Sequence, residues 1–191
     1  SEMCIRDSYW SAGFALISVG CILALLRSSG LLLVGIWFAN GLLIISHWLF
    51  FAGVARFTET RLSPAWLLVV VIWFALLLLP EGPEWSKIML LVNSLLIALI
   101  TIRASFLLRP RGKSLGAGAA QLRFVLLGHG LFYIAKTIPV LMPGTLIDLA
   151  AFRGEIIQIS LVEGVMALML IALSMTGTVR YRREKRICLL Y

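Results

Sequence analysis

Long apolar runs alternate with short polar connections along this chain. Each run approaches the roughly 20 residues that a helix needs to cross the hydrocarbon core of a bilayer. No run shows the period-two alternation of a barrel strand, and a helix satisfies its backbone polar groups within the segment. The pattern therefore predicts an all-α integral membrane bundle of about six transmembrane helices. The expected spans are 9–26, 31–55, 64–79, 86–108, 122–142 and 156–179, of which the third is short.

Composition supports a membrane protein. Of the 191 residues, 61% are hydrophobic and 14% are charged, whereas soluble domains are about half apolar and about a quarter charged. The net charge of +8 is then typical of cytoplasmic loops and does not indicate nucleic-acid binding. The lipid bilayer is the expected surrounding, and no nucleic-acid partner is expected.

Basic residues predict the orientation of the bundle. They gather in every second connection, near Arg56, near Arg109 and after Val179. Because cytoplasmic loops carry the excess of Lys and Arg, the C-terminus is expected in the cytoplasm. The stretch after the sixth run would anchor this topology, and it contains Arg180, Arg182, Arg183, Lys185 and Arg186.

Both ends of the chain are expected to be foreign to the native protein. Residues 1–8, SEMCIRDS, and 188–191, CLLY, resemble translated sequencing adapter, and ordinary polar termini are the alternative. The transmembrane domain is then expected over 9–179, followed by the start of a cytoplasmic helix over 180–187.

Ionisable side chains inside apolar runs are candidate site residues, because placing them in a bilayer is unfavourable. Counted at 1.5 Å per residue, Lys136 in the fifth run and Glu163 in the sixth lie roughly 10 Å below the outer surface. We predict an ion pair between them. Asn93 at similar depth and Asn40 somewhat deeper could join the same pocket. The alternative is structural, with the pair setting helix register and the asparagines holding helices together.

The two histidines of the chain, His47 and His129, lie at matched depth in the second and fifth runs. Bis-histidine ligation of haem needs such a match. The alternative is a hydrogen bond to a neighbouring helix, and a purified protein without a Soret band would exclude haem. No cofactor is predicted, and no cluster of cysteines or other ligands indicates a metal.

Catalytic motifs are missing from the sequence. It contains no Gly-rich phosphate loop, no H-E-x-x-H and no nucleophile elbow. The paired carboxylates typical of proton-driven transporters are also missing, since Glu163 is the only acid within a run. Small residues that allow close helix approach are frequent instead; they include Gly13, Gly20, Gly35, Ala39 and Gly53.

Several stretches resemble a known family. YWSAGFALISVGCILALLR (9–27) and ANGLLIISHWLFFAGVARF (39–57) resemble the multi-pass sensory region that precedes the GGDEF domain of bacterial diguanylate cyclases. The basic exit LMLIALSMTGTVRYRREKRI (168–187) resembles the point where such proteins enter a signalling helix. The GGDEF motif and its metal and nucleotide residues are absent from this chain, so no catalytic residue is carried over.

The resemblance implies a signal-input (sensor) domain in the inner membrane of a bacterium. An unknown external ligand or membrane stimulus would shift the helices near Lys136 and Glu163. The shift would pass through the last helix into a homodimeric exit helix, which would set the spacing of two cyclase domains that make cyclic di-GMP. The alternatives are a small stand-alone transporter or channel, which should show flux in vesicles, and a bis-His haem protein, which should be coloured.

Overall fold

Every regular element that the structure describes is a helix. The computed structural model describes residues 2–31, 33–78, 84–109, 116–142 and 155–188. Five of its helices are long and apolar enough to cross a membrane, and a sixth apolar helix, Pro64–Leu78, is shorter. The five long ones cover Ser8–Leu25, Leu33–Phe57, Lys87–Leu107, Ala117–Leu141 and Gln158–Tyr181. The predicted all-α, multi-pass membrane class is therefore confirmed.

The chain forms α-helices joined by tighter or wider helical turns. The α-helices are α1 (Glu2–Leu25), α2 (Ala39–Phe57), α3 (Leu68–Ala75), α4 (Trp85–Leu107), α5 (Ala117–Ala135), α6 (Thr137–Leu141) and α7 (Glu155–Cys188). A 3₁₀ turn, Leu26–Ser29, follows α1, and a π-helical turn, Leu33–Phe38, leads into α2. The 3₁₀ turns Pro64–Leu67 and Leu76–Leu78 flank α3.

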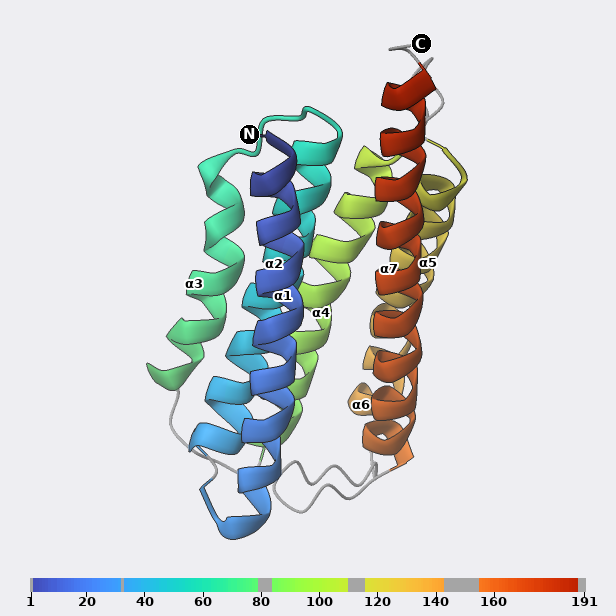
Figure 1. Cartoon of the computed structure of the whole chain (residues 1–191). Coiled ribbons are helices and arrows are strands. Elements are labelled where there is room, and N and C mark those ends of the chain that lie inside the picture. Colours follow the sequence, from blue (N-terminus) through green and yellow to red (C-terminus); the bar gives the residue numbers. More distant parts are fainter. Residues whose placement is uncertain (1, 32, 79–83, 110–115, 143–154, 189–191) are drawn as a thin grey trace.

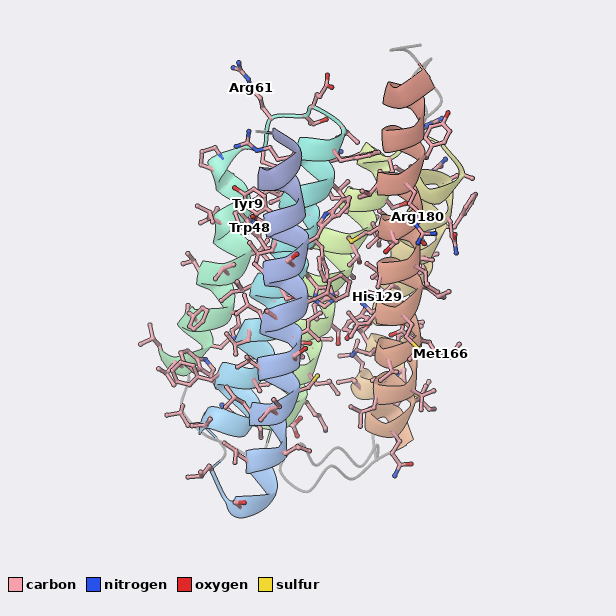
Figure 2. The ribbon with its side chains drawn as sticks, in the orientation of Figure 1. Tyr9, Trp48, Arg61, His129, Met166 and Arg180 are labelled. Carbon is pink, nitrogen blue, oxygen red and sulfur yellow. The ribbon has the colours of Figure 1, made fainter. Side chains whose placement is uncertain are left out.

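The long helices run up and down along one direction, and both ends of the chain lie at the same end of the bundle (Figure 1). In the packing, α2 contacts α1 and α4, α4 contacts α5, and α5 contacts α7. Arg61 and Arg180 both lie toward the end that holds the termini (Figure 2). We call this end the basic end. Alternate connections of the chain thus return to the same side, as the charge pattern indicates.

Two helices extend beyond the expected spans. The first begins at Glu2 and not near residue 9, and α7 continues past the expected end of the span at residue 179, through the helix expected over 180–187, to Cys188. The segment 180–187 is rich in Arg, Lys and Glu, which are good helix formers. Nothing in it stops a helix, because it contains neither Pro nor Gly. The basic exit is therefore part of the last membrane helix.

The fifth span is divided by a break at Lys136. Helix α5 ends at Ala135, and the short α6 contains Pro139. Proline lacks the backbone N–H that would bond the carbonyl four residues earlier, and its ring clashes with that carbonyl. In this helix the affected carbonyl belongs to Ala135. The helix is accordingly interrupted before Pro139, and Lys136 lies at the junction between α5 and α6.

Helices α1 and α2 pack closely because two glycines replace side chains at their contact. A Cβ atom on Gly13 would lie 2.6 Å from Phe50 Cε1, and one on Gly53 would collide with the indole of Trp10. The buried Ser46 hydroxyl also donates a hydrogen bond of 2.7 Å to the Gly13 carbonyl. Close approach of backbones at small residues is the usual way in which membrane helices associate.

The π-helical turn before α2 is linked to α3 by an indole. Such a turn shifts the ladder of backbone hydrogen bonds. The Trp37 carbonyl within it accepts a hydrogen bond of 3.0 Å from Nε1 of Trp73, whose side chain is fully buried. This bond and the packing of the same indole against Gly41 hold the short third span to the bundle.

The packing at Gly53 predicts a difference between two glycine substitutions. We expect Gly53→Ala to destabilise the fold by about 1–3 kcal/mol, because the added methyl group must displace Trp10. Gly164→Ala is the matched control, since a Cβ there has no neighbour within 4 Å and alanine favours the helix. Unfolding titrations in micelles, followed by circular dichroism, measure both. Equal stability of the two variants would contradict the contact.

Candidate functional site

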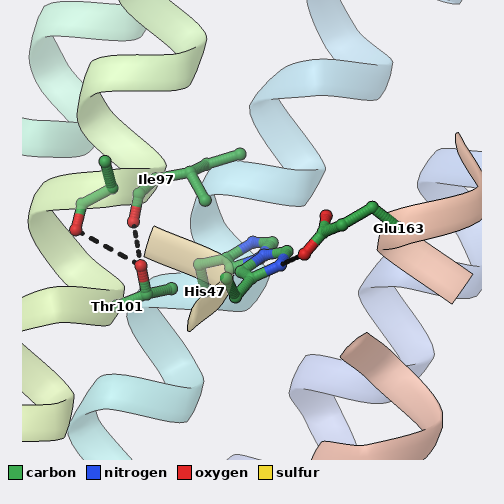
Figure 3. A network of polar contacts seen from close by, with 6 residues as sticks. His47, Ile97, Thr101 and Glu163 are labelled. Atoms are coloured by element: carbon green, nitrogen blue, oxygen red, sulfur yellow. Dashed lines mark hydrogen bonds and ion pairs between the residues drawn. The ribbon is translucent and has the colours of Figure 1, made fainter. Parts of the chain in front are cut away.

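A line of hydrogen bonds crosses the bundle from α2 through α5 to α7 (Figure 3). It begins at the Leu43 carbonyl oxygen, which lies 2.6 Å from Nδ1 of His47. Nε2 of His47 lies 3.2 Å from Nε2 of His129. Nδ1 of His129 lies 2.7 Å from Oε1 of Glu163. Side chains from three helices far apart in sequence are therefore joined inside the membrane-spanning region.

The two imidazoles are enclosed by protein, whereas the Glu163 side chain is partly exposed. His47 and His129 are 6% and 5% exposed, and the Glu163 side chain is 20% exposed. On the α4 side, a Cβ on Gly130 would lie 2.7 Å from Oγ1 of Thr101, so α4 side chains pack closely against α5 at the residue that follows His129. The line therefore runs from the packed interior toward the surface of α7.

The donors and acceptors of this line determine where its hydrogens lie. A carbonyl oxygen only accepts, so Nδ1 of His47 carries a hydrogen. With Nε2 of a neutral His47 as the acceptor, Nε2 of His129 donates. One further hydrogen then lies between Nδ1 of His129 and Oε1 of Glu163. It makes either an imidazolium–carboxylate pair or a neutral imidazole with a carboxylic acid, and the net charge of the line is zero in both cases.

One oxygen of the carboxylate lacks a partner. Oε2 of Glu163 is buried and has no hydrogen-bond partner among the described residues. Burying a carboxylate oxygen without a donor is unfavourable by about 1–3 kcal/mol or more. The pair with His129 therefore engages only one of the two carboxylate oxygens, which leaves the other as an acceptor for another group.

The structure brings the two histidines together, as their matched depth suggested, but in an arrangement that does not fit haem. Two imidazoles that ligate a haem iron from opposite faces hold their nitrogens about 4 Å apart, twice a metal–nitrogen bond of about 2 Å. The two Nε2 atoms are 3.2 Å apart, and the rings are parallel, at 1°, with centroids 5.4 Å apart. The histidines bond directly to each other, so the donors present do not fit a haem iron between them.

The predicted ion pair between Lys136 and Glu163 is not formed. Among the described residues, the Glu163 carboxylate pairs within 4.0 Å only with His129. His129 precedes Lys136 by seven residues on α5, which is about two helical turns. Nζ of Lys136 lies 3.7 Å from the ring centroid of Tyr133, in a cation–π contact. Counting residues from the ends of the spans gives only an approximate depth in the membrane. It could not show which turn of α5 faces Glu163.

The two asparagines also remain outside the line. Nδ2 of Asn40 donates to the Ile36 carbonyl of its own helix at 2.7 Å. Asn93 is buried, and its Nδ2 has no partner among the described residues. Neither contacts Lys136 or Glu163 through a hydrogen bond that the structure describes. Hydrogen bonds thus join His47, His129 and Glu163, and a pocket of Lys136, Glu163, Asn93 and Asn40 stays a prediction.

Tyr133 is the site residue that the sequence analysis missed. Its ring centroid lies 4.8 Å from that of His129, and Lys136 covers its ring. Positions 129, 133 and 136 follow the i, i+4, i+7 spacing of one helix face. That spacing was the signal that could have placed all three side chains on one side of the fifth span.

A groove lies beside the carboxylate, between α5 and α7. It encloses about 550 Å³. Its walls are apolar apart from His129, Glu163 and Gln158, and they include Phe124, Val125, Gly128, Ile159, Val162 and Met166. Figure 2 shows His129 and Met166 at neighbouring heights of the bundle. The polar line therefore ends at a groove within the membrane-spanning part of the two helices.

Helices α5 and α7 meet a second time at the basic end. A Cβ on Gly118 would lie 2.6 Å from the backbone nitrogen of Thr178, and the Cα of Gly118 is within 3.9 Å of where a Cβ of Gly177 would lie. Beyond this crossing, Arg180 is exposed. The side chains of Arg182, Arg183, Lys185 and Arg186 lie outside the described part of α7. Their roles as an anchor stay predictions.

The geometry predicts which charged pair stabilises the fold. In a double-mutant cycle, His129→Ala and Glu163→Ala are expected to couple by about 1–2 kcal/mol, as charge-assisted hydrogen bonds between membrane helices do. Lys136→Met and Glu163→Ala are expected to couple more weakly, because they are not in contact. Detergent unfolding titrations measure both cycles. If Lys136 couples to Glu163 more strongly than His129 does, the ion pair predicted from the sequence is supported and the hydrogen bond to His129 is contradicted.

Comparison with known proteins returns no match to a family model, a curated protein or a solved structure. The resemblance to sensory regions is therefore carried by the quoted stretches alone. The chain is an all-α protein with five long apolar helices that can cross a membrane, and its function is argued below from the line of hydrogen bonds and from α7.

Proposed function

We propose that this chain is a membrane signal-input domain that passes a stimulus through α7 to a cytoplasmic output domain. The observation that carries this proposal is the continuity of α7. A single helix, Glu155–Cys188, holds Glu163 of the polar line and also the whole basic exit. A change in the contact between His129 and Glu163 therefore acts on the same rigid element that leaves the membrane.

The length of α7 suits this role. Its 34 residues span about 51 Å at 1.5 Å per residue, which exceeds the roughly 30 Å of the hydrocarbon core. Glu163 and Arg180 are separated by about 25 Å along the helix axis. Since no break interrupts the helix between them, displacement at one position must move the other.

Helix α7 is one of the two least buried long helices, since the window of α1 is also 22% buried. Only 22% of its membrane window is buried, whereas 61% of the window of α4 is buried. Its main partner is α5. Signal transmission needs an element with two arrangements of similar free energy, and a helix held to the bundle on one side needs to break few contacts to shift.

The hydrogen-bond line favours an input domain over a proton-conducting transporter. Conduction needs groups that both accept and release protons along a continuous path. The line ends at the Leu43 carbonyl, which only accepts a hydrogen bond. Within the described residues a proton can therefore move between His129 and Glu163 but finds no onward carrier past His47, which suits a local switch better than a path across the membrane.

Orientation and output follow from charge and from the family resemblance. The basic end holds both termini, and the positive-inside rule assigns it to the cytoplasm, in the inner membrane of a bacterium. The stretches at 9–27, 39–57 and 168–187 support a diguanylate cyclase as the output domain. Two copies of the exit helix would then pair and set the distance between two cyclase domains that form cyclic di-GMP.

A fusion tests the proposal. Residues 9–187 are joined in frame to a GGDEF domain that is active only as a dimer, in a bacterial host without cyclases of its own. We expect Glu163→Gln to change the cyclic di-GMP level by about threefold or more, because removing the charge shifts an equilibrium by about 0.7 kcal/mol or more. Glu84→Gln is the matched control, since Glu84 pairs with Lys87 at the surface.

Two results would contradict the proposal. One is a fusion whose output is the same for the native sequence, for Glu163→Gln and for a variant with two glycines inserted after Arg180, which interrupt α7. The other comes from the DNA that follows the codon for Ile187 in the source genome. A frame that continues into an output domain supports the proposal, and a native stop codon within a few residues contradicts it.

A further inference from the structure

The groove between α5 and α7 lies at the depth of the bilayer. Its α5 wall belongs to the span Ala117–Leu141 and its α7 wall to the span Gln158–Tyr181. Several wall residues are open at the protein surface, with Phe124, Val162 and Met166 66%, 62% and 59% exposed. A molecule in this groove would therefore arrive from the lipid phase and would touch lipid along one side.

The groove is open to the protein surface, and its volume and apolar lining fall within the range of small-molecule sites. Its 550 Å³ falls within the range of about 300–1,000 Å³ that is typical of ligand pockets. Such pockets have apolar walls and few polar groups that fix the orientation of the ligand. Here the polar groups converge at one place, where Glu163 meets His129.

The carboxylate determines which polar group a ligand must carry. Oε1 of Glu163 is bonded to His129, and the buried Oε2 has no donor among the described residues. No other acidic or basic side chain, apart from His129, lines the groove in the part of the chain that the structure describes. An acyl chain would fill the apolar walls but would leave Oε2 unpaired, whereas a hydroxyl or ammonium group would donate to the carboxylate after a small side-chain rotation.

We propose that the groove between α5 and α7 binds a lipid-soluble molecule with an apolar body and a hydroxyl or ammonium group, which donates a hydrogen bond to Glu163. Because the same carboxylate holds α7 to His129, the ligand competes for or reorients that contact. The further step, that this ligand is the stimulus of the input domain, rests on the proposed function. The binding itself needs no output domain and is measured separately.

Two glycines supply a matched pair of variants. Gly128 lines the groove, and a Cβ on it would have no neighbour within 4 Å. Gly128→Leu therefore places a side chain into the groove without displacing the core. Gly164 lies outside the groove lining and also has open space at its Cβ. Gly164→Leu adds the same side chain next to Glu163 in sequence and leaves the groove open.

The test is photolabelling of the whole chain in phosphatidylcholine vesicles. The probes are dodecanol and dodecylamine that carry a diazirine in the chain, and the comparison probe is the same diazirine-bearing chain with a methyl end. We expect at least one polar probe to label peptides around Phe124 and Val162 about fivefold more strongly than the hydrocarbon does, and unlabelled polar amphiphile to compete. Labelling should fall to the hydrocarbon level in Gly128→Leu and persist in Gly164→Leu.

Other outcomes overturn the inference. If the hydrocarbon probe labels the groove as strongly as the polar probes do, acyl chains fill the groove without selection. Equal loss in both leucine variants, with unchanged circular dichroism, means that labelling does not depend on this groove. Protection of the groove from all probes, together with crosslinks between the α7 helices of two copies, means that a second copy covers it. The variant Glu163→Leu removes both carboxylate oxygens. If the carboxylate selects the polar probes, this variant should label equally with the polar probes and with the hydrocarbon probe.

The two proposals fail in different ways. If labelling shows no selectivity but the Glu163→Gln fusion changes cyclic di-GMP, the input domain stands and this ligand class is wrong. If selective labelling occurs but neither the probes nor Glu163→Gln alters the output of the fusion, the groove is a binding site and the proposed signalling role is wrong.

Discussion

The hydrogen bond between His129 and Glu163 is the contact on which the arrangement of the last helix depends. Lipid is as apolar as the side chains of a membrane helix, so apolar burial does little to bring membrane helices together. Helix α7 exposes most of its surface and has few alternatives for attachment. It is held to α5 by this polar contact and by the glycine crossing near Thr178. Its side chains Ile171 and Met175 also pack into the core, so these contacts together set the position of the basic exit.

The two sides of the bundle are built on different principles. Helices α1, α2 and α3 interlock through glycines, the Ser46 hydroxyl and buried indoles, which leaves little room for alternative arrangements. The contact of α5 with α7 has an open groove and an unpaired carboxylate oxygen. Closely packed helices α1 to α3 therefore lie beside a more openly packed pair, α5 and α7. The hydrogen bond between His47 and His129 joins the two sides.

Hydropathy and the small residues sufficed to predict the all-α membrane class and the close contact at Gly53. Those features depend on composition or on one residue. The break at Lys136 was not predicted, since 122–142 was expected to be one span. The partner of Glu163 depends on how α5 and α7 are tilted and on how each is rotated about its own axis. Both helices carry apolar residues on every face, so the sequence does not indicate which face points toward the neighbouring helix. Counting residues gave depth to within about two turns, which was too coarse to choose between Lys136 and His129.

The crossing at Gly118 and Thr178 divides α7 into two arms of a lever. Glu163 lies 15 residues before Thr178, and Cys188 lies 10 residues after it. The arms are therefore about 22 Å and about 15 Å long. If the backbone contact at the glycines serves as the fulcrum, a sideways step of Glu163 moves the end of the helix in the opposite direction by about two thirds of that step. In the proposed input domain, a change of hydrogen-bond partner inside the membrane would thereby become a smaller, reversed displacement at the basic end.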